Sequence, residues 1–423
     1  MRTSVIDNIK KNAFWNTLGI TFNSFNSLFF LIIVSRINGI NDAGVFGFSF
    51  ALASLWFIIG LYAGRTFQVS DIYNETSDSE YLVHKVWTAS LMVLVAIVYV
   101  YAKGYHLEKS IVILALTIYK ALEAFSDTLY GYLQKKQLLY IAGISLFWKS
   151  FVAVFLFLLV DLLTKNLVLA CLSIIFVNLI FIFSYDFPNV NKIMTFEKIE
   201  VKNTLALFKK GFSIFIFSFL SIYIVNVSKY VIDEQLANQF QAVFNIIVMP
   251  ATIISLCGQY IVQPLLNQLI EYFYNHKYKE LKKTTTKISL ALLMIDIIAL
   301  LGAFLLGIPV LNLLYGVDVS AYRFDLLIVI AGALFYSCAS VYSTVLITMR
   351  KTTPQIFLFA TSSLVGLFLA KHLVTAYHIH GAIYAYFMIM LLHFSLIYGY
   401  FYYEYRQLIK DEHAKSNGLL SLK

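Results

Sequence analysis

The sequence predicts an all-α polytopic membrane protein, with about twelve transmembrane helices in two six-helix halves. Of its 423 residues, 60% are hydrophobic and only 13% are charged, which is too little charge for the surface of a soluble domain. The apolar residues lie in runs long enough to cross a bilayer as helices. Both observations place nearly the whole chain in lipid.

The predicted spans follow the apolar runs, each of roughly 20 residues, the length that crosses the hydrocarbon core as a helix. The loops between them are short, so we predict no soluble domain large enough to carry chemistry of its own. In chain order the spans are 13–36, 43–64, 86–102, 110–130, 141–162 and 166–185, then 211–231, 240–264, 287–308, 325–348, 355–376 and 381–402.

A polar stretch at 186–210, predicted to be an amphipathic linker, divides the spans into two equal sets. The first span of each set ends in a similar tripeptide, Val34-Ser35-Arg36 and Val227-Ser228-Lys229. Paired halves around a midplane site are a common plan of transporters. We therefore predict three parts, an N-terminal half at 1–195, a C-terminal half at 196–410 and a cytoplasmic tail at 411–423.

The distribution of basic residues predicts the orientation. If the N-terminus is inside, most of the 32 lysines and arginines fall in cytoplasmic segments, as the positive-inside rule requires. The external segments then hold only Arg36, Lys103, Lys109, Lys165 and Arg323. We expect both termini to be cytoplasmic and the protein to lie in the cytoplasmic membrane.

Three ionisable residues, Lys120, Glu123 and Asp127, lie on one narrow face of the fourth span. An ionisable side chain inside a membrane is costly, so it faces either a partner or a water-filled cavity. One interpretation is an internal ion pair that locks this span to its neighbour. The other is the charged wall of a pathway, which we favour because three groups exceed what a lock requires.

Further candidates for the cavity wall lie on other spans. Lys149 lies inside the fifth span, while Arg36 and Lys229 end the first and seventh spans; extension of these side chains to the interface is the competing interpretation. Helix packing is the alternative for amides such as Asn226. We expect substrate binding from Arg36, Lys120, Glu123, Asp127, Lys149, Asn226 and Lys229, and ion coupling from Glu123, Asp127 and Asp296.

The charges inside the spans are mixed, with positive groups in excess. A net positive pathway suits an anionic substrate such as a pyrophosphate. We expect no nucleic-acid partner, because the basic residues are scattered between apolar runs and form no patch. The cysteines lack metal-binding spacing, so we expect neither a metal nor a cofactor.

Four groups of motifs are spread over most of the chain. They are Asp42–Gly47 with Gly64–Asp71, the face formed by Lys120, Glu123, Asp127, Gly131 and Gln134, Ser228–Asp233 with Phe244–Ile247 and Met249-Pro250, and Gly307–Pro309 with Leu314–Gly316. These motifs resemble those of the polysaccharide repeat-unit flippases, the Wzx-like O-antigen and capsule flippases of the multidrug/oligosaccharidyl-lipid/polysaccharide (MOP) exporter superfamily. One departure is Ser228, where the family pattern has proline before the Lys-Tyr pair.

This resemblance implies a flippase that moves undecaprenyl-pyrophosphate-linked sugar repeat units to the outer leaflet for capsule, exopolysaccharide or O-antigen synthesis. The two halves would form a V-shaped cavity that opens alternately to each side and uses an ion gradient. Expected partners are the lipid-linked glycan, the bilayer, and polysaccharide polymerase and chain-length proteins. No enzymatic activity and no catalytic residue are expected.

Two alternatives stay open. A MATE-like exporter of small molecules would share the architecture, and only the chemistry of its lumen would differ. A membrane polysaccharide polymerase or ligase belongs to a different class, and the short external loops weigh against it, because such enzymes need an exposed domain to hold two substrates.

The predicted topology can be tested by labelling single cysteines from outside the cell. A cysteine that replaces Lys282 should be protected, because the basic residues around it place this loop in the cytoplasm. A cysteine that replaces Tyr105 should react. The opposite pattern of labelling would reverse the orientation.

Overall fold

The computed structural model describes residues 2–71, 73 and 75–420, and the described chain is almost entirely helical. The predicted all-α fold class is confirmed. In the first half the helices are α1 (Arg2–Ser24), α2 (Asn26–Ile37), α3 (Ile40–Leu61), α4 (Gly64–Ser70), α5 (Asp78–Lys103), α6 (Leu107–Lys135), α7 (Leu139–Thr164), α8 (Leu167–Phe181) and α9 (Phe187–Asn191), with a π-helical turn η1 (Ile182–Asp186) between α8 and α9.

The second half begins with two long helices and ends with the longest. Its elements are α10 (Val201–Gln235), α11 (Asn238–Tyr274), α12 (Tyr278–Gly302), a π-helical turn η2 (Ala303–Gly307), α13 (Ile308–Tyr315), a short 3-10 turn η3 (Ser320–Tyr322), α14 (Arg323–Thr348) and α15 (Thr352–Leu420). Within α15 the backbone breaks at His378, which has a φ of 51°.

Ten helices of the described chain are long and apolar enough to cross a membrane. The helix α6 is not among them, because Lys120, Glu123 and Asp127 lie within its apolar stretch, and α15 counts once although His378 divides it. Each predicted span is made mostly of helix, with an interruption at Phe25 in the first span and at Tyr62 and Ala63 in the second. Many helices extend beyond the predicted ends, because polar residues can continue a helix outside the hydrocarbon core.

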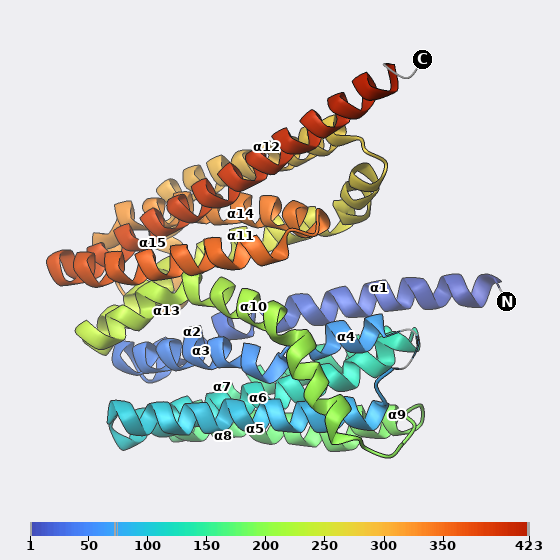
Figure 1. Cartoon of the computed structure of the whole chain (residues 1–423). Helices are drawn as coiled ribbons and strands as arrows, with labels where there is room; N and C mark the ends of the chain where they lie inside the picture. Colours follow the sequence, from blue (N-terminus) through green and yellow to red (C-terminus); the bar gives the residue numbers. More distant parts are fainter. Residues whose placement is uncertain (1, 72, 74, 421–423) are drawn as a thin grey trace. The chain divides into compact units, whose positions relative to one another are not determined.

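The chain forms two compact units, Met1–Ile222 with Tyr315–Val317, and Tyr223–Leu314 with Asp318–Lys423. In the first unit, α1 packs on α7, α3 packs on α6, and α8 lies against both α6 and α7 (Figure 1). In the second unit, α14 packs against α11, α12 and α15. The division falls inside α10, because the beginning of that helix packs on the first unit.

The aromatic ring of Tyr62 joins α10 to the first unit. It stacks on Phe215, with ring centroids 4.7 Å apart, and its hydroxyl donates to the Phe208 carbonyl oxygen at 3.3 Å. The proposed half boundary at 195/196 assigns all of α10 to the C-terminal half. Packing thus divides the chain at a different place from the sequence pattern.

The linker before α10 is extended and docks on the beginning of α5. Backbone N–H groups of Thr195, Glu197 and Glu200 donate to the side chains of Asp78 at 3.3 Å, Ser79 at 3.0 Å and Glu80 at 3.1 Å. An extended backbone has no internal hydrogen bonds, so these side chains supply the acceptors that it needs. Part of the stretch predicted to be an amphipathic linker is therefore a non-helical segment that is bound by three consecutive residues at the beginning of α5.

Asp71 orders the loop between α4 and α5. Its carboxylate accepts hydrogen bonds from the backbone of Glu75 at 2.9 Å and Thr76 at 3.0 Å, and from the Tyr81 hydroxyl at 3.3 Å. Burial works to raise the pKa of Asp71, but these bonds, together with the charge of Lys135, outweigh it and hold the pKa below its ordinary value. The contribution to stability is present at neutral pH and is lost as the pH falls through that lowered pKa.

Two glycines allow α1 and α7 to cross closely. A Cβ atom on Gly143 would lie 2.4 Å from the Trp15 carbonyl carbon, and one on Gly19 would lie 2.5 Å from the Gly143 carbonyl oxygen. Small residues at helix crossings let backbones approach in a membrane, where van der Waals packing drives association. The crossing of α1 and α7 therefore depends on the absence of side chains at these positions.

We predict that Gly143→Ala lowers the free energy of unfolding by about 1–3 kcal/mol, because the added methyl group meets backbone atoms that cannot rotate away. Thermal unfolding of the purified protein in detergent measures the effect. The matched control is Gly399→Ala, since no atom lies within 4 Å of a Cβ added there. Equal stability of the two variants would contradict the close crossing.

Candidate functional site

The charged face predicted for the fourth span lies on α6, and its first two members form an ion pair. The Lys120 ammonium lies 2.5 Å from the Glu123 carboxylate, and the Tyr119 hydroxyl donates to the same carboxylate at 2.9 Å. The ammonium also lies over the rings of Phe50 and Phe57, 4.9 and 5.3 Å from their centroids. Lys120 is thus held by one carboxylate and by aromatic faces, which attract a cation.

The third member of that face, Asp127, pairs with another helix. Its carboxylate accepts from the Arg65 guanidinium at 2.8 Å, and the same guanidinium donates twice to Gln134, at 2.8 and 3.0 Å. The side chains of Arg65 and Asp127 are 29% and 23% exposed, so the pair is open to solvent or ligand. Arg65, which belongs to the motif Gly64–Asp71, is the partner that joins α4 to α6.

A cavity of about 150 Å³ lies beside this pair in the first unit. Three parts of the chain contribute: the junction of α3 and α4, one residue of α6, and the beginning of α10. The lining residues are Ile58, Leu61, Ala63, Gly64, Arg65, Thr66, Asp127, Ile214, Phe215 and Ser218. The cavity thus combines a guanidinium, a carboxylate and two hydroxyls with an apolar floor.

Lys149 on α7 is buried and paired with an acid that sequence reasoning missed. Its ammonium lies 2.9 Å from the Asp186 carboxylate and 2.7 Å from the Ser126 hydroxyl, and Ser145 also donates to Asp186. The side chains of Lys149 and Asp186 are 5% and 1% exposed. Asp186 lies just past the end of the predicted span 166–185, where it was assigned to the linker; the helical continuation through η1 carries it into the packed interior.

Lys229 lies on α10 in the second unit and is partly buried. None of the described residues pairs with its ammonium in a hydrogen bond or a salt bridge, whereas the neighbouring Ser228 donates to the Ala382 carbonyl oxygen at 3.1 Å. Asn226 lies one turn earlier on the same helix and has polar contacts of its own. At Ser228, where the family pattern has proline, the hydroxyl anchors α10 to α15.

Arg36 lies at the end of α2 and is exposed. Its side chain runs along Gly316, where a Cβ atom would lie 3.5 Å from the Arg36 Cγ atom, and Gly316 has a φ of 68°. The neighbouring Ser35 hydroxyl donates to the Tyr315 carbonyl oxygen at 2.7 Å. The turn at Tyr315–Val317 is therefore anchored at the end of α2, beside the guanidinium.

Two carboxylates in spanning helices are fully buried without an ion pair among the described residues. Asp161 accepts from the Asn38 amide at 3.0 Å with one oxygen, while its other oxygen finds no partner in the described chain. Asp296 on α12 is 1% exposed, and one of its oxygens likewise finds no partner there. Buried carboxylates of this kind are costly when ionised, so each is a candidate for binding a proton or a cation.

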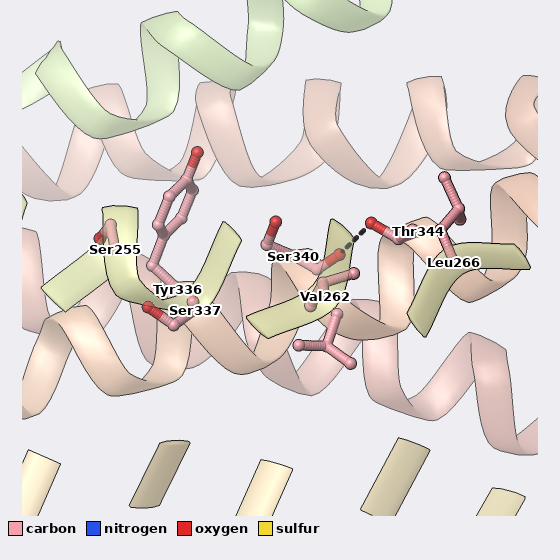
Figure 2. Close-up of a pocket in the computed structure, with 9 residues that line it drawn as sticks. Ser255, Val262, Leu266, Tyr336, Ser337, Ser340 and Thr344 are labelled. Atoms are coloured by element: carbon pink, nitrogen blue, oxygen red, sulfur yellow. Dashed lines mark hydrogen bonds between the residues drawn. The ribbon is translucent and has the colours of Figure 1, made fainter. Parts of the chain in front are cut away.

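A second cavity, of about 290 Å³, lies in the second unit between α11 and α14. Figure 2 shows the side chains of Ser255, Tyr336, Ser337, Ser340 and Thr344 around it, with Thr344 donating to the Ser340 carbonyl oxygen at 2.9 Å. The Ser337 hydroxyl is buried and finds no partner among the described residues. No sequence motif pointed to this group, because isolated serines at helical spacing are typical of ordinary helix packing.

The structure therefore distributes the predicted site residues over several places. Lys120 with Glu123, Asp127 with Arg65, and Lys149 with Asp186 form three separate pairs in the first unit. Lys229, Asn226 and Asp296 belong to the second unit, and Arg36 lies at the end of α2. Within the described residues no group of three or more His, Cys, Asp or Glu side chains is arranged to hold a metal ion.

Comparison with known proteins gives one relative in sequence and several in fold. No protein-family model matches the chain. It is 24% identical, over 328 residues, to the capsular polysaccharide biosynthesis protein CapF of Staphylococcus aureus, which covers 76% of this chain and 81% of that protein. The resemblance expected from the motifs is thus supported by a protein of capsule synthesis.

Solved structures establish the fold. An inward-facing multidrug resistance MATE family transporter of the MOP superfamily superposes with a TM-score of 0.66 at 12% identity, covering 93% of this chain and 99% of that one. The lipid II flippase MurJ in an inward closed conformation superposes with a TM-score of 0.65 at 13% identity, covering 90% and 86%. The chain has the MATE/MOP fold, and the predicted multi-pass membrane architecture is confirmed.

Substitution of Lys149 tests whether its buried pair with Asp186 is structural or whether Lys149 binds substrate. Lys149→Met should lower the free energy of unfolding by about 3–5 kcal/mol, because it leaves the Asp186 carboxylate buried without its counter-charge. The double variant Lys149→Met/Asp186→Leu should recover most of that loss in thermal unfolding. If Lys149→Met is as stable as the parent protein, the pair is not structural and a ligand-binding role for Lys149 gains support.

Proposed function

We propose that this protein is a flippase that moves undecaprenyl-pyrophosphate-linked oligosaccharide repeat units across the cytoplasmic membrane. It works by alternating access and is coupled to an ion gradient, with both termini in the cytoplasm. The MATE/MOP fold and the similarity to a capsule-synthesis protein support this proposal. The polysaccharide made from the exported units is a capsule, an exopolysaccharide or an O-antigen.

The observation that carries the proposal is the Lys229 ammonium, which has no counter-charge among the described residues. A partly buried charge inside a membrane protein is costly unless it is paired. An anionic ligand supplies the missing partner, and the head group of a lipid-linked oligosaccharide is a pyrophosphate. We assign Asn226 and Lys229 of the second unit to this head group, and we propose Arg36 as a separate substrate-binding residue of the first unit.

The cavity beside Arg65 provides a second place for a phosphate in the first unit. A guanidinium forms parallel hydrogen bonds with phosphate oxygens as readily as with a carboxylate. Asp127 and Gln134 hold Arg65 in the absence of ligand, and an incoming phosphate would compete with Asp127. We propose that Asp127 thereby keeps Arg65 ordered until substrate arrives, while Lys120 and Glu123 form the neighbouring wall.

Coupling to an ion gradient needs a group that binds a proton or a cation reversibly. Among Glu123, Asp127 and Asp296, only Asp296 has no ion-pair partner in the described chain, because Glu123 pairs with Lys120 and Asp127 with Arg65. We propose Asp296 as the coupling carboxylate of the second unit. Uptake of a proton or cation there would remove the cost of a buried, uncompensated negative charge.

The second candidate function is export of a small molecule. It is favoured by the likeness to MATE transporters and by the hydroxyl-lined cavity between α11 and α14 (Figure 2). Hydroxyl groups also bind sugars, so this cavity is compatible with both functions. Discrimination depends on whether loss of the protein abolishes surface polysaccharide or only sensitises cells to toxic compounds.

We predict that Lys229→Gln loses most of the surface polysaccharide, normalised to the amount of protein in the membrane. Lys229→Arg should keep much of it, because a phosphate needs a nearby positive charge more than a particular shape. The measurement is polysaccharide at the surface of cells that carry each variant in place of the original gene.

Lys371→Gln is the matched control, because Lys371 is also a lysine of the second unit but pairs with Glu234 at 3.3 Å and is 44% exposed. It should export normally. If Lys229→Gln also exports normally, Lys229 does not bind the head group, and the positive charge of Arg65 becomes the next candidate.

A further inference from the structure

The helix of the second span is broken by two residues in the left-handed conformation. The helix α3 ends at Leu61, Tyr62 has a φ of 40° and Ala63 a φ of 55°, and α4 begins at Gly64. This conformation costs about 1–2 kcal/mol for each residue that carries a side chain. The break also leaves carbonyl oxygens at the end of α3 without the amide partners that a continuous helix would supply.

A buried lysine satisfies these carbonyl oxygens. The Lys85 ammonium, on α5, donates to the carbonyl oxygens of Gly60 at 2.6 Å and Leu61 at 2.9 Å. The Thr88 hydroxyl, almost one turn further along α5, donates to the same Gly60 oxygen at 2.9 Å. Lys85 is 0% exposed, so in the parent protein its ammonium is shielded from bulk water.

No carboxylate forms an ion pair with Lys85 within the described residues. Asp127 acts on it electrostatically, but the carboxylate of Asp127 lies against Arg65 at 2.8 Å. The ammonium lies instead at the C-terminal end of α3, where the peptide dipoles accumulate negative charge. Its direct hydrogen-bond partners are oxygen atoms of the backbone.

This geometry is that of a cation site. Broken transporter helices coordinate alkali cations through unwound backbone carbonyls and the C-terminal ends of half-helices. We propose that the α3–α4 break is a monovalent-cation site that the chain occupies with its own ammonium group, that of Lys85. Because the Lys85 ammonium group is covalently part of the chain, the broken conformation needs no dissolved cation at this position.

Removal of the Lys85 ammonium group should leave the cation site at the α3–α4 break empty. Truncation of Lys85 to alanine exposes the oxygens of Gly60, Leu61 and Thr88 to a space shaped for a propylammonium group. A dissolved cation can then bind there, and binding to the folded state alone raises stability by mass action. The variant should therefore acquire a cation dependence at the α3–α4 break, where the parent protein has none.

The experiment is thermal unfolding of the purified full-length protein in detergent, in choline buffer with added Na⁺ or n-propylammonium. Lys85→Ala should unfold at a lower temperature than the parent protein in choline alone, and n-propylammonium or Na⁺ should restore at least about half of that loss. The parent protein should respond less than Lys85→Ala, because it can bind an added cation only at other sites, such as Asp296. Unfolding needs no substrate, so this result is independent of the proposed transport function.

Lys85→Met is the matched control, because its side chain fills the same space but brings neither charge nor donor. It should be destabilised in choline and should respond to either cation no more than the parent protein does. Adding Thr88→Val to Lys85→Ala should weaken the response, because one of the three oxygens is lost. If Lys85→Ala cannot be purified in choline, it is purified in n-propylammonium, and unfolding on removal of that cation supports the proposal.

Three results would overturn the proposal. One is a Lys85→Met variant as stable as the parent protein, which would make the charge unnecessary. Another is a Lys85→Ala variant that no cation stabilises more than it stabilises Lys85→Met. The third is recovery of Lys85→Met, but not of Lys85→Ala, during purification in n-propylammonium.

Discussion

Inside a bilayer no water is available to polar groups, so every backbone carbonyl and every charge must find its partner within the protein. This constraint explains why almost every described residue is helical. It also explains what happens where a helix stops. At the break after Leu61, the ammonium of Lys85 and the hydroxyl of Thr88 donate to the carbonyl oxygens that the missing amides would otherwise bind. The ring of Phe215 on α10 stacks on Tyr62.

The same constraint sorts the charges of the spans into two kinds. Lys120, Lys149 and Arg65 each lie against a carboxylate, and these pairs connect or stiffen the helices of the first unit. Lys229 and Asp296 in the second unit lack such a partner among the described residues. Charges that the protein leaves uncompensated are the ones at which a ligand gains most by binding.

The predicted function depends differently on these two kinds of charge. An anionic head group must be attracted to positive charge, yet it must also leave, so a site made only of strong, permanent pairs would serve poorly. The Arg65–Asp127 pair is partly exposed and is therefore open to exchange with a phosphate, whereas the Lys149–Asp186 pair is almost fully buried. Of these two pairs, the exposed one is therefore the better candidate for binding an anionic ligand, and the buried one is the better candidate for a structural role.

Hydropathy and the local period of a helix were sufficient to predict the all-α membrane fold, the spans and the helical face of Lys120, Glu123 and Asp127. They could not assign partners on other helices. Only the packed structure shows that Asp127 pairs with Arg65, that Lys149 pairs with Asp186, and that Lys85 covers the end of α3. Pairing joins residues far apart in the chain, and only the packing of one helix against another brings their charges within reach.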